Sequence, residues 1–121
     1  MAYVETTDWG TWKSIPQVAA YVNWNPSATP QTLNVVVIDE VPKGTKAVGG
    51  WFKVTSSGAG DVVSITSTGS SESRNPVITQ VASVPVIGMF EVDLDSSYSF
   101  DVVATHLNIS DVDIYITKIA L

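Results

Sequence analysis

Few residues in this chain could do chemistry, and the first of them is a single histidine. His106 lies in the segment ATHLNIS between two strand-like runs, and the chain contains no cysteine. A serine hydrolase would need His106 beside a carboxylate such as Asp101 or Asp111, yet no Gly-x-Ser-x-Gly turn marks a nucleophile. We therefore interpret His106 as a loop residue, and we expect neither enzymatic activity nor a cofactor.

Carboxylates form the second group that could do chemistry. Glu91, Asp93 and Asp95 alternate along one strand-like run, and Asp111 and Asp113 repeat this spacing near the C-terminus. If the two strands were neighbours, the carboxylates would converge, and calcium accepts such oxygen ligands. However, the glycine-containing ligand loop of an EF-hand is missing, and a solvated strand face also carries alternating acids. Zinc is less favoured, because it prefers histidine and thiolate ligands. We predict no metal site, with calcium on this acidic face as the alternative.

Large aromatic side chains are the remaining candidates for binding. We predict that the following residues bind a partner: Tyr3, Trp9, Trp12, Tyr21, Trp24 and Trp51. Tryptophan is enriched at interfaces, so these residues could anchor the N-terminal segment to its own domain or to a neighbouring subunit. The alternative is that the tryptophans stack on sugar rings while nearby acids and amides hydrogen-bond the sugar hydroxyls.

Composition limits the partners of the chain. A net charge of −6 over 121 residues repels phosphate backbones, which disfavours nucleic acid as a partner. No apolar run approaches the roughly 20 residues of a membrane-spanning helix, so we expect no membrane partner. Only 15% of the residues are charged, where about 25% is usual. Such a surface exposes either hydroxyl groups or apolar area, and apolar area would indicate an oligomer or partner interface.

The elements that must position these residues are strands. We predict an irregular, aromatic-rich arm and linker over residues 1–32 and a β-sandwich domain over residues 33–121. Within the arm, residues 18–24 alternate as an edge strand would, although residues 14–17 could instead cap a short helix. Deleting residues 1–24 is expected to leave the sandwich folded.

A central hairpin is predicted over residues 33–54, with its turn at Pro42 and Gly44. In its second strand Phe52 should face inward and Trp51 outward, while Gly49 and Gly50 suggest a bulge or a close backbone approach. Residues 56–60 should form a second hairpin loop, and residues 66–76 a long polar, mobile loop. Further strands are expected around residues 63–65, 77–84, 90–94, 98–104 and 112–116. The fold class is therefore all-β, an antiparallel sandwich or jelly roll of seven to eight strands.

Three stretches carry a resemblance to a known class of proteins. They are the runs VIDEVPKGTKAVGGWFKVTSSGAG and FEVDLDSSYSFDVVA and the closing run SDVDIYITKIAL, and the resemblance rests in particular on residues 41–48 and 110–116. Over residues 33–121 the chain resembles small β-sandwich proteins of tailed bacteriophage virions, such as capsid decoration (cement) proteins and fibre domains. The resemblance implies a non-enzymatic, homotrimeric virion protein that contacts the major capsid protein, and it carries over no site residue. The alternative is a carbohydrate- or receptor-binding module of a phage fibre or a secreted protein.

Overall fold

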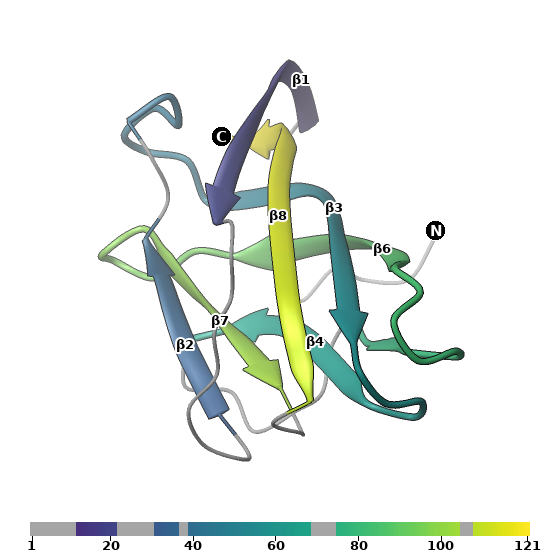
Figure 1. Ribbon diagram of the computed structural model, residues 1–121. Coiled ribbons are helices and arrows are strands. Elements are labelled where there is room, and N and C mark those ends of the chain that lie inside the picture. The colour runs from purple at the N-terminus through teal and green to yellow at the C-terminus, as the bar shows by residue number, and fades with distance from the viewer. Residues whose placement is uncertain (1–11, 22–30, 37–38, 69–74, 105–107) are drawn as a thin grey trace, which may run out of the picture.

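Two four-stranded antiparallel β-sheets make up the described part of the protein (Figure 1). The computed structural model describes residues 12–21, 31–36, 39–68, 75–104 and 108–121. The first sheet has the order β1 (Trp12–Tyr21), β8 (Ile109–Ala120), β3 (Ala47–Ser56), β6 (Val86–Asp93). The second sheet has the order β2 (Gln31–Val36), β7 (Ser99–Ala104), β4 (Val62–Ser67), β5 (Val77–Ile78). The prediction of an all-β antiparallel sandwich is confirmed. Among the described residues no helix is long and apolar enough to cross a membrane.

The core lies between the two sheets and follows the period-2 alternation of the strands. In β3, Phe52 is fully buried while Trp51 and Lys53 on the opposite face are only half-buried, as predicted. Phe90 of β6 packs between the sheets, with its ring centroid 6.1 Å from that of Phe52 and 5.9 Å from that of Phe100 in β7. Tilted and edge-to-face aromatic pairs of this kind add about 0.5–1.5 kcal/mol to the energy of burial.

The predicted central hairpin over residues 33–54 is wrong. β2 pairs with β7, whereas β3 pairs with β6 and β8, so the two strands belong to different sheets. The turn itself is present, because the Thr45 backbone N–H donates to the Pro42 carbonyl at 3.2 Å and Gly44 has a φ of 93°. A turn signal specifies that the chain changes direction, but it does not specify which strand becomes the neighbour.

The predicted hairpin at residues 56–60 is wrong for the same reason, since β3 and β4 also lie in different sheets. The expected strand over residues 77–84 is shorter than predicted, because β5 spans only Val77–Ile78. After β5 the chain is held by Thr79, whose N–H donates to the Asp61 carbonyl at 2.9 Å and whose hydroxyl donates to the Gly58 carbonyl at 3.0 Å. These bonds fix the next segment to the connection between β3 and β4, and residues 81–84 then form turns.

The described part of the predicted arm and linker consists of the edge strand β1, paired with β8, and of residues 31 and 32, which begin β2. The strand interpretation of this segment is therefore confirmed and its helical alternative is wrong, although the strand begins at Trp12. Four residues of β1 pack against the core, namely Ile15, Val18, Ala20 and Tyr21. Residues 12–21 are thus regular and belong to the first sheet, while residues 1–11 and 22–30 lie outside the described ranges.

Gly49 and Gly50 combine the two features predicted for them. The register between β3 and β8 shifts between these two glycines, which is a bulge. A Cβ atom on Gly50 would lie 1.9 Å from the Tyr115 carbonyl oxygen. Only glycine allows β3 and β8 to approach this closely.

Candidate functional site

The outer face of the first sheet holds two of the residues predicted to bind a partner, Trp12 and Trp51. The other described member of that set, Tyr21, packs against the core instead. Tyr3, Trp9 and Trp24 lie outside the described residues. The structure therefore places only Trp12 and Trp51 of the predicted set on one sheet face, where Trp12 contacts Lys118 and Trp51 contacts Tyr115.

Trp51 connects three strands of the first sheet. Its ring stacks on Tyr115 of β8, with centroids 4.4 Å apart and planes inclined by 24°. Its indole N–H donates to the Gln17 side-chain oxygen of β1 at 3.0 Å. One aromatic face and the polar edge of Trp51 are thus engaged within the chain, which agrees with an anchor onto its own domain.

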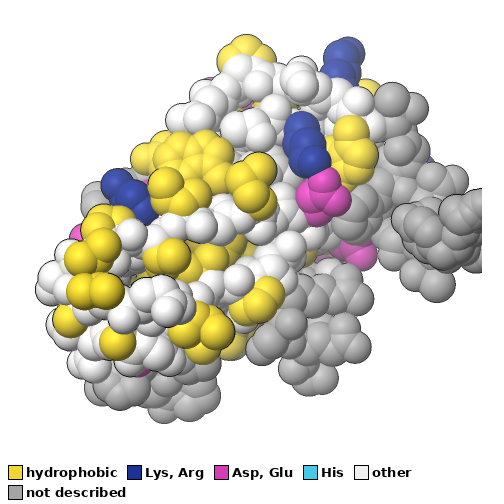
Figure 2. Space-filling view, turned by 90° about the vertical axis from the view of Figure 1, so that its right-hand side faces the viewer, with side chains coloured by type: hydrophobic (Ala, Val, Ile, Leu, Met, Phe, Trp, Pro, Cys, Tyr) yellow, Lys and Arg dark blue, Asp and Glu magenta, His cyan; other side chains and the backbone are white. Residues whose placement is uncertain are grey.

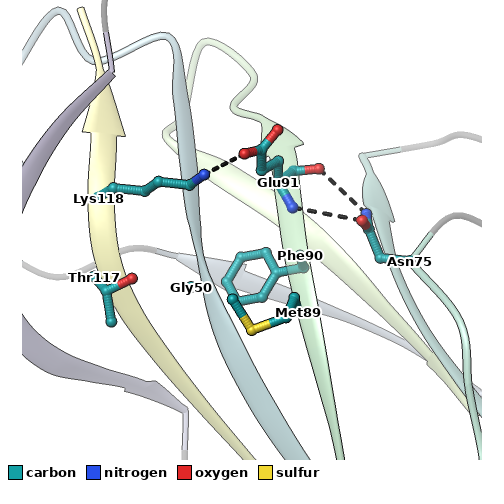
Figure 3. A pocket seen from close by; sticks show the side chains of 7 residues that line it. All are labelled: Gly50, Asn75, Met89, Phe90, Glu91, Thr117 and Lys118. Carbon is teal, nitrogen blue, oxygen red and sulfur yellow. Dashed lines mark hydrogen bonds and ion pairs between the residues drawn. The ribbon is translucent and has the colours of Figure 1, made fainter.

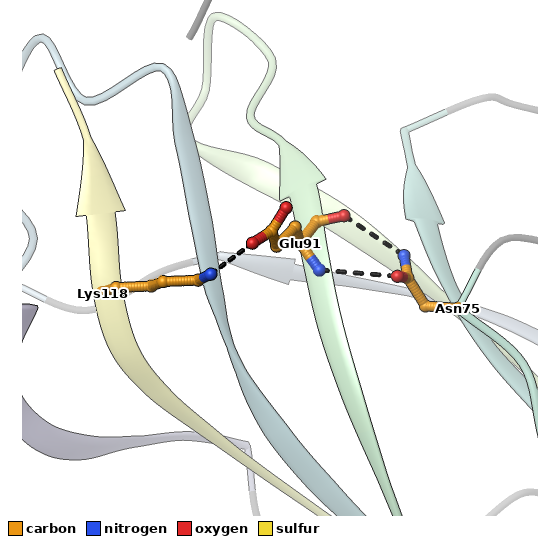
Figure 4. A network of polar contacts seen from close by, with 3 residues as sticks. All are labelled: Asn75, Glu91 and Lys118. Carbon is orange, nitrogen blue, oxygen red and sulfur yellow. Dashed lines mark hydrogen bonds and ion pairs between the residues drawn. The ribbon is translucent and has the colours of Figure 1, made fainter. Parts of the chain in front are cut away.

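Lys118 links the two outermost strands of the first sheet. Its ammonium nitrogen lies 4.6 Å from the ring centroid of Trp12 in β1 and forms an ion pair with Glu91 of β6. To reach Glu91 the side chain crosses β3, as Figure 4 shows. It can do so because β3 carries Gly49 there, where a Cβ atom would lie 2.6 Å from the Lys118 Cε.

Asn75 approaches Glu91 from the opposite side, where none of the described strands pairs with β6 (Figure 4). Its amide nitrogen donates to the Glu91 carbonyl at 3.2 Å and to the Ile65 carbonyl at 2.9 Å, and the Glu91 N–H donates to its amide oxygen at 3.4 Å. Asn75 has a φ of 48°, a conformation that asparagine tolerates better than most residues. The amide replaces a strand partner at this one position. Of the predicted mobile loop, residues 69–74 lie outside the described ranges.

A shallow hollow of about 360 Å³ lies among these residues (Figure 3). Its lining consists of Gly50, Asn75, Met89, Phe90, Glu91, Thr117 and Lys118. Glu91 is the one carboxylate of this lining, and it is paired with Lys118. General acid and base catalysis by two carboxylates would need a second one. The amide and the ion pair could instead hydrogen-bond a small polar ligand.

The five carboxylates considered for calcium do not converge. β6 and β8 are not neighbours, because β3 lies between them. Glu91 pairs with Lys118, and Asp113 lies 3.7 Å from the ammonium nitrogen of Lys53. Within the described ranges no three His, Cys, Asp or Glu residues form a group that could hold a metal ion.

Asp95 is occupied by backbone groups of the turn that follows β6. Its carboxylate accepts the N–H of Ser97 at 2.8 Å and that of Ser99 at 2.9 Å. These hydrogen bonds, led by that of Ser99, lower the pKa of Asp95 below its ordinary value of 3.8. Asp95 therefore stabilises a turn.

The three residues considered for a hydrolase lie in different parts of the chain. Asp101 is buried in β7 and Asp111 is exposed on β8, and His106 lies outside the described residues. The expectation that the chain is not an enzyme stays a prediction.

An apolar surface that the sequence analysis missed lies where both sheets end. The residues are Ile78, Val81, Val84, Ile87 and Met89, each between 48% and 74% exposed. We call this surface the apolar edge, because β5 and β6 are the last strands of their sheets. Figure 2, which faces the right-hand side of Figure 1, shows many hydrophobic and few charged side chains on the described surface. The signal was present in the sequence, because Ile87 and Met89 occupy the same strand phase as the solvated Glu91.

Comparison of the chain with known protein families, with curated proteins and with solved structures found no match. The function of these surfaces therefore has to be inferred from their residues.

Proposed function

We propose that this chain is a structural protein that works by assembly, and specifically a capsid decoration protein of a tailed bacteriophage virion. It would join copies of itself and contact the major capsid protein, without transforming a substrate. The observation that carries this proposal is the apolar edge. Its five large apolar side chains are each 48% to 74% exposed, and apolar surface that stays in water on a soluble protein marks protein interfaces.

The chemistry of the rest of the surface supports an assembly role. The described residues that could act on a ligand are engaged with one another, as Lys118 is with Glu91 and Trp51 is with Tyr115. Charged residues make up only 15% of the chain, so few charged groups have to lose their water when copies pack together. The resemblance of residues 33–121 to virion sandwich proteins provides the setting, and the homotrimer that it implies stays a prediction.

The proposal is tested on virus particles that contain the gene for this chain. Particles purified on a density gradient are digested, and the copy number of the chain is measured by mass spectrometry against the most abundant shell protein. A decoration protein is expected at a copy number comparable to that of the shell protein. A few copies per particle would instead indicate a fibre, and absence of the chain would overturn the virion role. An abundant host protein serves as the contamination control.

A glycan-binding module is the second candidate, and the hollow beside Lys118 favours it. The hollow combines the Asn75 amide and the Glu91 carboxylate with the nearby ring of Trp12. Polar groups next to an aromatic face are suited to a sugar. This role predicts a saturable change in tryptophan fluorescence when glycans are added, and the change should be lost in Glu91→Gln. A negative result across a broad glycan array would exclude this role.

A further inference from the structure

We infer that two copies of this chain pair through β6, edge to edge and antiparallel, across a two-fold axis at Gly88. The partner is a second copy of the chain, and the contact joins the first sheets of both copies into one continuous sheet. This pairing would supply one contact of the proposed assembly, so it rests on the proposed function for its biological purpose.

The first step concerns the open side of β6. In an antiparallel ladder, residues that exchange hydrogen bonds with one neighbour alternate with residues whose N–H and C=O point the other way. The Glu91 N–H and C=O both bond to Asn75, so they point away from β3. Ile87 and Met89 lie in the same phase, so their backbone groups also point away from β3. Among the described residues no strand pairs with that side of β6.

Both ends of this open side are closed. At one end, Asn75 already occupies the backbone groups of Glu91. At the other end, Pro85 directly precedes β6 and has no N–H to donate. Between these ends, the N–H and C=O groups of Ile87 and Met89 have no partner among the described residues.

One register uses all of these groups. If Ile87 of each copy lies opposite Met89 of the other, every free N–H and C=O of the two residues finds a partner. The same register places Pro85 opposite Glu91, which are the two positions that cannot contribute. Shifting by two residues sets Met89 against Pro85 or Ile87 against the capped Glu91, and either shift leaves backbone groups unpaired. The open side of β6 is thus self-complementary around Gly88.

The side chains permit this approach. Ile87 is 62% exposed and Met89 is 74% exposed, and residues 86–90 include no charged side chain. Edge strands that avoid pairing carry charges, proline or bulges in their interior, and this stretch has none of them. Lys53, which lies opposite Ile87 in β3, is paired with Asp113, and Glu91 is paired with Lys118. Two copies can therefore meet without placing uncompensated charges side by side.

The first experiment measures the molar mass of the full chain against concentration by sedimentation velocity. The wild-type chain is expected to shift from monomer to dimer. In Met89→Lys, each ammonium group would lie opposite Ile87 of the other copy and diagonal to the second lysine, so the dissociation constant should rise about tenfold or more, which corresponds to about 1.4 kcal/mol. The matched control is Leu121→Lys, an equally large change of charge at an exposed apolar residue outside β6. Its dissociation constant should stay within about twofold of the wild-type value.

The second experiment tests the register, using the absence of cysteine from the chain. Directly opposite residues in a hydrogen-bonded pair have Cα atoms roughly 5.5 Å apart, within reach of a disulfide. Diagonal residues lie roughly 7–8 Å apart, which is beyond that reach. Mild oxidation of a mixture of Ile87→Cys and Met89→Cys should therefore yield a mixed disulfide dimer in preference to either homodimer.

Several results would overturn the pairing. They are a wild-type chain that remains monomeric at all concentrations, a trimer unaffected by Met89→Lys, and homodimers that oxidise as readily as the mixed dimer. The outcomes for the proposed function are separate. If the chain is absent from virus particles but Met89→Lys abolishes dimerisation, the virion role fails and the β6 pairing stands. If the chain is abundant in particles but monomeric in solution, the virion role stands and the β6 pairing fails.

Discussion

The two edges of the first sheet, β1 and β6, are built in opposite ways. β1 has two register shifts against β8, and Pro16 lies within the first of them, between Ser14 and Val18. β6 pairs with β3 in an unbroken register from Val86 to Asp93. Irregular pairing and an interior proline make β1 a poor template for another strand, whereas β6 is regular along its whole length.

The exposed side chains also make β1 less suited than β6 to pairing with another strand. Besides Pro16 and Ala19, β1 exposes the polar or charged residues Lys13, Ser14 and Gln17, whereas β6 exposes Ile87 and Met89 besides Glu91. A sheet in which one edge resists pairing while the other is regular and apolar does not avoid strand pairing in general. The difference indicates that pairing is prevented at β1 and permitted at β6.

The largest expected effect comes from removing β1, the edge strand that resists pairing. Deleting residues 1–24 takes away β1 with Ile15, Val18 and Tyr21, which pack against the core. We expect a loss of about 3 kcal/mol or more in the free energy of unfolding, since fully burying one such side chain contributes about 1.5–3 kcal/mol. The newly open side of β8 should also cause aggregation. This expectation replaces the sequence-based one that the truncated sandwich stays folded.

Urea denaturation and light scattering measure both consequences. Deleting only residues 1–11, which leaves β1 in place, is the matched control and should preserve the stability that β1 provides. A 1–24 deletion that unfolds at the same urea concentration as this control would show that β1 adds nothing to the sheet.

A smaller effect is expected from opening the capped end of β6. Asn75→Gly removes the amide that bonds Glu91 and Ile65, while glycine accepts the φ of 48° without strain. The free energy of unfolding should fall by about 1–3 kcal/mol, because buried or edge backbone groups lose their partners. Self-association should rise, because Glu91 becomes available to a second strand. A stability within about 0.5 kcal/mol of the wild type would mean that the amide is not a cap.

The link between the two edges should have the next smaller effect. Gly49→Ala places a Cβ atom 2.6 Å from the Lys118 Cε and should push the lysine off Glu91 and Trp12. We expect a cost of about 1 kcal/mol or less, because the ion pair is partly exposed and screened. Lys118→Met keeps most of the stem and removes the charge. If both changes break the same link, the double variant should cost little more than the larger single change in urea denaturation. Additive costs would contradict the link.

The sequence predicted where the strands lie better than which strands pair with each other. The variants above test contacts that depend on this pairing, which the sequence could not predict. Alternation located the inward face of β3 and the acidic outer faces of β6 and β8, because period-2 burial is a local property of each strand. It could not show that β2 and β3 lie in different sheets, since apolar alternation is the same whichever strand lies beside it. The strand predicted over residues 77–84 was too long for a different reason. Val81 and Val84 have the apolar side chains of a strand interior, but they lie exposed in a turn.

The candidate site depended on the same missing information. Lys118 and Gly49 act together only because β8 and β3 are neighbours, and Asn75 acts as a cap only because β6 ends the sheet. Ile87 and Met89 gave a usable local signal, because they are apolar residues at positions that the alternation predicts to be exposed to solvent. Recognising them as a pairing edge still required the strand order.

The smallest expected effect concerns the turn that ends β6, and it appears as a pH dependence. Asp95 accepts backbone N–H groups from Ser97 and Ser99, and these bonds lower its pKa in the folded chain. A lowered folded pKa means that the unfolded chain binds the proton more readily, so the contribution of Asp95 is present above the unfolded pKa and is lost as pH falls through the folded one. Asp95→Asn keeps a hydrogen-bond acceptor but does not titrate. The stability advantage of the wild type over Asp95→Asn in urea denaturation should therefore be full at about pH 6 and shrink towards about pH 3. A difference that is constant over this range would show that the carboxylate charge does not stabilise the turn.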